Sequence, residues 1–185
     1  MQKLWHSIYL PTNLKDYTIP TFDFSKKSYI LDLVENKYII PDELNYFFSL
    51  CGLELMDHTL LFACQPGYAG FLHKDIHSYP EWNGKYCYCS INIHLTEHRG
   101  CLEWYNNDHG SIEYSDVQTP YEFYPTANDN ALDSWHGHWP ALIRTDIAHR
   151  ANNLSGTGPR VTATIRFKGN PNWETTINHL KDFIL

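Results

Sequence analysis

The segment YCYCSINIHL, residues 86–95, constrains the fold most, because its polar and apolar residues alternate without a break. Successive side chains of a β-strand point to opposite faces, so the pattern predicts a strand with two different faces. The apolar face must be packed, while the polar face suits either solvent or the lining of a polar cavity. The polar face carries Tyr86, Tyr88, Ser90, Asn92 and His94, and the apolar face carries Cys87, Cys89, Ile91, Ile93 and Leu95.

Short apolar runs separated by turn residues continue through most of the chain and predict further strands. Helices are expected at the two ends, because residues 41–52 begin with Pro and two acids and stop at a glycine, and residues 172–185 place apolar residues at helical spacing. This combination favours an antiparallel sandwich or jelly roll over a parallel α/β sheet. The further expected strands are residues 58–64, 101–105, 111–114, 140–146 and 160–167.

The composition limits the classes of protein to which the chain can belong. The 185 residues contain no internal repeat and no Gly/Ser linker, so we expect one domain spanning residues 1–185. The formal charge of −7 disfavours a broad contact with nucleic acid or anionic lipid. Neither a signal peptide nor a membrane span is evident, and the five cysteines have no spacing typical of a secreted scaffold. We therefore expect a soluble, cytoplasmic protein with reduced thiols.

His73 and Asp75 lie two residues apart, which places both side chains on one face of a predicted strand. A second imidazole, His149, ends a strand-like run much farther along the chain, and Arg160 begins the next run. Two histidines and one carboxylate form the arrangement that holds non-haem Fe(II) and leaves positions open for substrate and oxygen. An arginine offers a planar fork that matches a carboxylate. These residues predict a metal site beside a carboxylate-binding site.

Other interpretations of the same residue types stay open. His73 and Asp75 could be a hydrogen-bonded turn pair, and Arg160 could be a surface cation. An isolated histidine is more often solvated or hydrogen-bonded than a ligand, and a strand-end aspartate more often caps a turn. For the His-X-His motif at 136–138, an entrance loop is favoured over a metal site. The competing ligand candidates are His77, His94, Asp146, His136 and His138.

With these residues in place, the chain resembles the superfamily of 2-oxoglutarate- and Fe(II)-dependent oxygenases. Members carry His-X-Asp on an early strand, a distal histidine on a late strand, and an arginine beyond it that is often followed closely by Ser or Thr. The segment SINIHLTEHRGCLEWY also resembles the central strands of that family, and the match covers about residues 60–167. The matching motif residues are His73, Asp75, His149, Arg160 and Thr162.

The resemblance implies a mainly β fold, with a double-stranded β-helix (jelly roll) core and flanking N- and C-terminal helices. It implies an enzyme in which His73, Asp75 and His149 hold Fe(II). Arg160 and Thr162 would hold the far carboxylate of the co-substrate 2-oxoglutarate, which is decarboxylated to succinate. Because Asp75 retains the carboxylate that related halogenases lack, hydroxylation is favoured over halogenation.

Further expectations concern the cavity and the substrate. Because a dicarboxylate needs hydrogen-bond donors, we expect Tyr88, Ser90 and Asn92 to face the cavity as additional co-substrate contacts. Molecular oxygen and a small-molecule or peptide/protein substrate are the implied partners, whereas nucleic acid is disfavoured by the acidic charge. The alternative function is a non-catalytic, cupin-like metal-binding module with the same β-helix.

Overall fold

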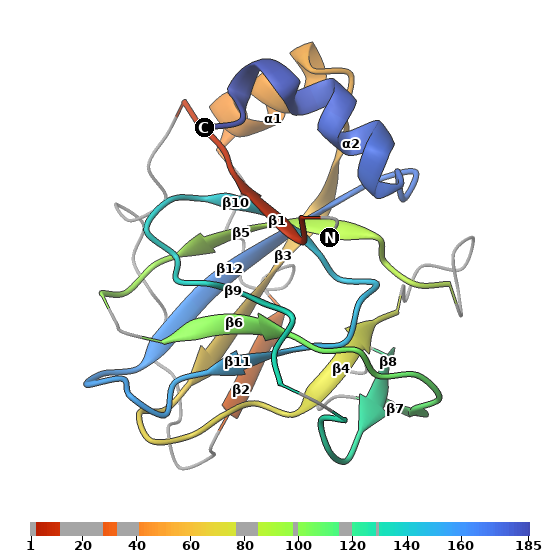
Figure 1. Cartoon of the computed structure of the whole chain (residues 1–185). Coiled ribbons are helices and arrows are strands. Elements are labelled where there is room, and N and C mark those ends of the chain that lie inside the picture. The colour runs from red at the N-terminus through yellow and green to blue at the C-terminus, as the bar shows by residue number, and fades with distance from the viewer. Residues whose placement is uncertain are drawn as a thin grey trace.

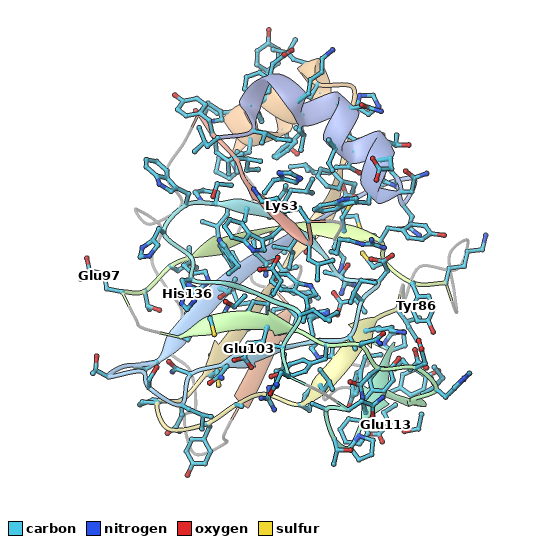
Figure 2. All side chains as sticks on the ribbon, viewed as in Figure 1. Lys3, Tyr86, Glu97, Glu103, Glu113 and His136 are labelled. Carbon is cyan, nitrogen blue, oxygen red and sulfur yellow. The ribbon has the colours of Figure 1, made fainter. Side chains whose placement is uncertain are left out.

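The computed structural model contains two antiparallel β-sheets packed face to face, with two helices on one side (Figure 1). Side chains from both sheets point into the space between them (Figure 2). The residues that the structure describes are 3–11, 28–32, 41–76, 85–97, 100–114, 120–128 and 130–185.

Each sheet contains six strands, and the chain crosses repeatedly from one sheet to the other. The first sheet has the order β1-β10-β5-β12-β3-β2, and the second has the order β7-β8-β4-β11-β6-β9. From β3 to β6, and again from β9 to β12, each strand lies in the opposite sheet from the strand before it. Such alternation between two antiparallel sheets makes the jelly roll, and the predicted mainly β double-stranded β-helix is confirmed.

The strand bounds follow the sheets. The first sheet consists of β1 (Trp5–Ser7), β10 (Ala141–Arg144), β5 (Cys89–His94), β12 (Arg160–Phe167), β3 (Leu55–Cys64) and β2 (Ser28–Asp32). The second sheet consists of β7 (Ser111–Tyr114), β8 (Pro120–Tyr124), β4 (Leu72–Asp75), β11 (His149–Asn152), β6 (Cys101–Trp104) and β9 (Asp133–Trp135).

Helix α1, Asp42–Leu50, begins and ends where the sequence predicts. Pro41 is its N-cap residue, and the acids in the first turn stabilise the positive end of the helix dipole. After the helix the chain reverses at Gly52, which has φ +75°, a conformation that glycine adopts without strain.

Helix α2, Trp173–Leu180, is shorter than the predicted C-terminal helix. The Asn172 side chain caps it by accepting a hydrogen bond from the Thr175 N–H, and a 3₁₀ turn, η3 (Lys181–Phe183), follows. Within the described residues, no helix is long and apolar enough to cross a membrane.

The two helices cover the outer face of the first sheet. The inner face of that sheet lines a pocket between the two sheets. Alternate residues of the central strands point toward the helices, and these residues are apolar. The residues that form this core include Leu44 and Phe48 of α1, Trp173 and Leu180 of α2, Cys89, Ile91 and Ile93 of β5, and Val161, Ala163 and Ile165 of β12.

Three strand predictions need correction. Strand β5 begins at Cys89, three residues later than the alternation in residues 86–95 suggests. The strand-like run that was expected to end at His149 ends as β10 at Arg144, and His149 begins β11 in the other sheet. Strands β1, β2, β8 and β9 were not among the predicted strands.

The core predicts a large effect of one truncation. Leu142 on β10 is fully buried under the helices and lies away from the pocket, so Leu142→Ala is expected to lower the free energy of unfolding by about 2–5 kcal/mol. The matched control is Leu154→Ala, whose side chain is 59% exposed and whose loss should change stability by less than about 0.5 kcal/mol. Urea denaturation of both variants measures the difference, and equal stabilities would contradict this core.

Candidate metal centre

Strand pairing brings the three predicted ligands together. His73 and Asp75 lie on β4, and His149 is the first residue of β11, where it pairs directly with His73 across the antiparallel ladder. The ligand atoms of the three side chains all lie within 4.8 Å of one another. Among the described residues, this is the one group of three or more such side chains close enough to hold a metal ion.

Backbone carbonyls orient both imidazole rings. His73 Nδ1 lies 3.1 Å from the Phe71 carbonyl oxygen, and His149 Nδ1 lies 2.8 Å from that of Ile147. Because a carbonyl oxygen only accepts hydrogen bonds, each neutral ring carries its proton on Nδ1 and keeps a lone pair on Nε2. The two Nε2 atoms lie 3.3 Å and 4.0 Å from the same carboxylate oxygen, Asp75 Oδ1. Two nitrogen lone pairs and one anionic oxygen therefore converge, as ligation of a divalent cation requires.

Asp75 is ionised although it is buried. Burial alone would raise the pKa of its carboxyl group, but the Arg166 guanidinium, 2.9 Å from Oδ2, favours the charged form. The two neighbouring histidines act in the same direction, so the pKa lies well below its usual range. The carboxylate is thus available as a ligand at any pH near neutrality.

His149 is neutral for a complementary reason. Its ring is buried, and burial together with the neighbouring His73 lowers the pKa of His149 to about 4. An imidazole that is neutral at pH 7 keeps the lone pair that a metal ion binds.

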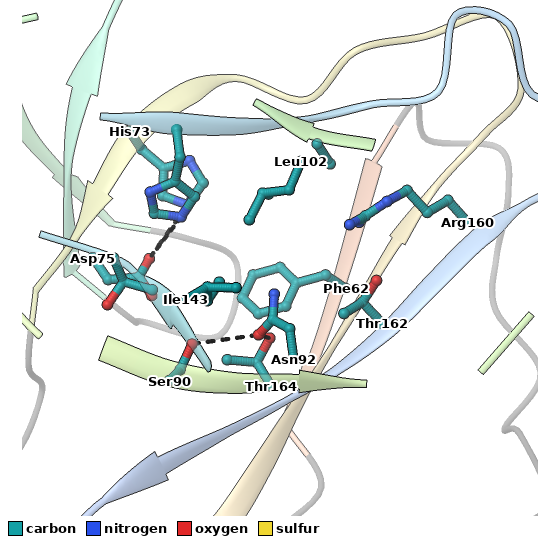
Figure 3. Close-up of a pocket in the computed structure, with 13 residues that line it drawn as sticks. Phe62, His73, Asp75, Ser90, Asn92, Leu102, Ile143, Arg160, Thr162 and Thr164 are labelled. Carbon is teal, nitrogen blue, oxygen red and sulfur yellow. Dashed lines mark hydrogen bonds and ion pairs between the residues drawn. The ribbon is translucent and has the colours of Figure 1, made fainter. Parts of the chain in front are cut away.

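The metal centre opens into a pocket that encloses about 390 Å³, including the part open to solvent. Figure 3 shows His73 and Asp75 at one end and Arg160 with Thr162 at the other. The sequence-predicted residues that line this pocket are His73, Asp75, Ser90, Asn92, His149, Arg160 and Thr162. Residues that the sequence did not single out complete the lining: Phe62, Leu102, Ile143, Thr145, Ala151 and Thr164.

Arg160 is a buried cation, only 2% exposed. Burial lowers its pKa to about 10, with the thiols of Cys64 and Cys101 acting in the opposite direction, so the guanidinium stays charged at neutral pH. No ion pair joins Arg160 to a carboxylate within the described part of the chain. A charge buried in this way requires a partner.

His94 supports Arg160 and takes no part in the ligand set. Arg160 donates a hydrogen bond from Nη2 to His94 Nε2 over 3.1 Å, and the His94 ring packs edge-on against Trp135 at 4.4 Å. A Cβ atom at Gly137 would lie 2.6 Å from the His94 ring, so only glycine fits behind it.

Two polar atoms at the Arg160 end of the pocket have no hydrogen-bond partner within the described residues. They are Arg160 Nε and Thr162 Oγ1, and both are buried. A buried donor without an acceptor costs about 1–3 kcal/mol, which is tolerated when a ligand supplies the acceptor. A carboxylate at this end would accept from both groups.

The inner face of β5 matches the predicted alternation at two of three positions. Ser90 and Asn92 line the pocket, and the hydroxyls of Ser90 and Thr164 both donate to Asn92 Oδ1, over 3.3 and 2.9 Å. The Asn92 amide nitrogen therefore points into the pocket (Figure 3). Tyr88 does not meet the expectation: it precedes the first residue of β5, is 39% exposed, and does not line the pocket.

The competing ligand candidates are placed elsewhere. His136, marked in Figure 2, and His138 are exposed in the segment after β9. The Asp146 carboxylate is held by Arg144 over 2.6 and 2.9 Å. His77 lies outside the described residues.

Arg166 is the site residue that sequence analysis missed. It lies on β12 at the same alternation as Arg160, Thr162 and Thr164, so the pattern of residues 160–167 contained the signal. Arginine is usually exposed, and its burial became visible only with its partner Asp75.

Comparisons with known proteins do not identify a family for this chain. No protein-family model and no curated protein matches the sequence. Among solved structures, E. coli YcfD is 12% identical and covers 87% of this chain at a TM-score of 0.48, while this chain spans 39% of YcfD. Oxalate decarboxylase from Bacillus subtilis is 13% identical over 85% of this chain and 34% of its own, at a TM-score of 0.36. Peruvianin-I, a cysteine peptidase from Thevetia peruviana latex, is 10% identical over 92% and 93%, also at 0.36.

The convergence of ligand atoms predicts where a metal ion binds. His149→Ala is expected to weaken Mn(II) binding by more than about 100-fold, beyond the usual effect of a residue outside the ligand set. The matched control is His136→Ala, which removes an exposed imidazole and should leave the affinity unchanged. Anaerobic Mn(II) titration, followed by the electron paramagnetic resonance signal of free Mn(II), measures both. Loss of binding in the His136 variant with retention in the His149 variant would contradict the assignment.

Proposed function

We propose that this protein is a 2-oxoglutarate- and Fe(II)-dependent oxygenase that hydroxylates a small molecule or a peptide/protein side chain. One observation carries the proposal: a single pocket joins a His-Asp-His ligand set to a buried arginine and a buried threonine. Arg160 Nε and Thr162 Oγ1 each lack a hydrogen-bond partner among the described residues. The first group fits a divalent metal, and the second fits the far end of a dicarboxylate.

The donor set fits Fe(II). His73, Asp75 and His149 would hold the ion through two imidazole nitrogens and one carboxylate oxygen, a set that leaves coordination positions open. With 2-oxoglutarate and molecular oxygen, the bound iron supplies oxidative decarboxylation to succinate and CO2 and the transfer of one oxygen atom to the substrate. The protein's part is to fix the ligands, orient the co-substrate and keep the pocket dry.

Arg160 and Thr162 fit the far carboxylate of 2-oxoglutarate. The guanidinium can donate two parallel hydrogen bonds to a carboxylate, and the Thr162 hydroxyl can donate another. Because Arg160 is buried, its attraction for an anion is screened less than at the surface. The Asn92 amide, directed into the pocket between the two ends, provides a further donor (Figure 3).

Apolar side chains also line the pocket. Phe62, Leu102 and Ile143 form the walls between the metal ligands and Arg160. Removing water strengthens every charge interaction in the pocket. The acidic charge of −7 and the absence of a basic stripe make a small molecule or a peptide the favoured substrate, over nucleic acid.

The role of Arg160 separates an oxygenase from a cupin-like metal-binding module. Arg160→Ala is expected to weaken 2-oxoglutarate binding to the Mn(II)-loaded protein by about 2–4 kcal/mol, because one end of the dicarboxylate loses its partner. Arg160→Lys should weaken binding less, since an ammonium keeps the charge but not the fork. Anaerobic calorimetry measures the affinities of the wild type and both variants.

The control is Arg150→Ala, which removes an arginine paired with Glu103 at 3.2 Å and leaves the pocket lining intact. Its 2-oxoglutarate affinity should equal that of the wild type. Mn(II) affinity should be nearly the same in all four proteins. If the wild type binds Mn(II) but 2-oxoglutarate binds equally well to every variant, the metal-binding module replaces the oxygenase as the proposed function.

A further inference from the structure

We propose that Arg166 is a positioning residue that makes Asp75 a ligand through one oxygen only. This inference rests on the proposed metal site. Arg166 Nη2 lies 2.9 Å from Asp75 Oδ2, and the two side chains are only 4% and 7% exposed. A charge-assisted hydrogen bond between buried groups holds both firmly.

The two oxygens of Asp75 lie in different surroundings. Oδ1 faces the Nε2 atoms of His73 and His149, at 3.3 and 4.0 Å. Oδ2 faces the guanidinium of Arg166. With Oδ2 held in this way, Oδ1 is the oxygen directed at the ion.

The number of ligand oxygens matters for the proposed chemistry. Two imidazoles and one carboxylate oxygen would leave coordination positions open for the co-substrate and oxygen. If both oxygens of Asp75 were ligands, one of those positions would be filled. Arg166 would therefore help to keep it open.

The ion pair bridges the two sheets. Arg166 lies on β12 in the first sheet, and Asp75 lies on β4 in the second. The backbone of Asp75 is fixed independently, because its N–H donates to the Thr145 carbonyl and its carbonyl accepts from the Cys87 N–H, both over 3.0 Å. Arg166 therefore sets the orientation of the carboxylate rather than the position of the strand.

Arg166 and Arg160 cannot exchange roles. Both lie on β12, but they are six residues apart, which corresponds to roughly 20 Å along a strand. Arg166 has a carboxylate partner in the protein, whereas no ion pair joins Arg160 to a carboxylate in the described part of the chain. One guanidinium serves a metal ligand, and the other is left for an incoming anion.

The test compares Arg166→Gln with Arg150→Gln. Both changes remove an arginine from an ion pair with a carboxylate, but only Arg166 contacts a metal ligand. Mn(II) affinity should fall about 10- to 100-fold in Arg166→Gln and stay at the wild-type value in Arg150→Gln. The visible absorption of the Co(II)-loaded protein, which depends on the number of ligand atoms, should change only in Arg166→Gln.

A double-mutant cycle shows whether Arg166 acts through Asp75. In an Asp75→Asn background, where no carboxylate remains to be oriented, Arg166→Gln should change Mn(II) affinity by less than about twofold. An effect of the same size in both backgrounds would mean that Arg166 acts through general stability, and would overturn the inference. Circular dichroism checks that each variant is folded, and if Arg166→Gln does not fold, Arg166→Lys is measured with the same criteria.

The outcomes separate this inference from the proposed function. If the wild type binds no Mn(II), both fail. If the wild type binds Mn(II), loses it in His149→Ala, and retains both affinity and Co(II) spectrum in the Arg166 variant, only the role of Arg166 is overturned.

Discussion

The pairing of β11 with β4 is the contact on which the metal site depends. It opposes His149 to His73, but only this one residue pair is in register between the two strands. In contrast, β11 pairs with β6 at four positions, and β4 pairs with β8 at four positions. Strands β6 and β8 therefore hold β11 and β4 in place. The ligand side chains meet where β11 and β4 are paired. A site formed in this way is sensitive to the packing of β6 and β8, although neither strand supplies a ligand.

Strand β12 supplies the Arg160 end of the pocket. Its two faces lie in different surroundings. Val161, Ala163 and Ile165 pack under the helices, while Arg160, Thr162 and Thr164 line the pocket and Arg166 contacts Asp75. Burying two arginines is unfavourable unless each finds a partner. Arg166 finds Asp75 within the protein, and the apolar packing on the opposite face offsets the cost of the cation at Arg160. Functional sites commonly retain such local costs.

Alternation and motif spacing predicted the parts of the site that depend on local geometry. The inner face of β5, the His73 and Asp75 pair and the two terminal helices all follow from side-chain period. Tyr88 was misplaced because alternation continues past the point where the β5 ladder ends, and only strand pairing decides that point. Strands β1, β2, β8 and β9 were missed, and the first two of these pair with strands distant in sequence. Arg166 was missed because a sequence pattern does not distinguish a buried arginine from a solvated one.

The charge of the pocket differs in sign from that of the chain. The chain carries −7, whereas two arginines against one aspartate leave the site with a net charge of +1 before any ion is bound. A divalent metal would add to this positive charge at one end, and Arg160 keeps its own charge at the other. A monocarboxylate could neutralise only one of these ends, but a dicarboxylate of suitable length meets both. Under the proposed function, a metal ion at one end of the pocket and Arg160 at the other would suit a short dicarboxylate better than a monocarboxylate.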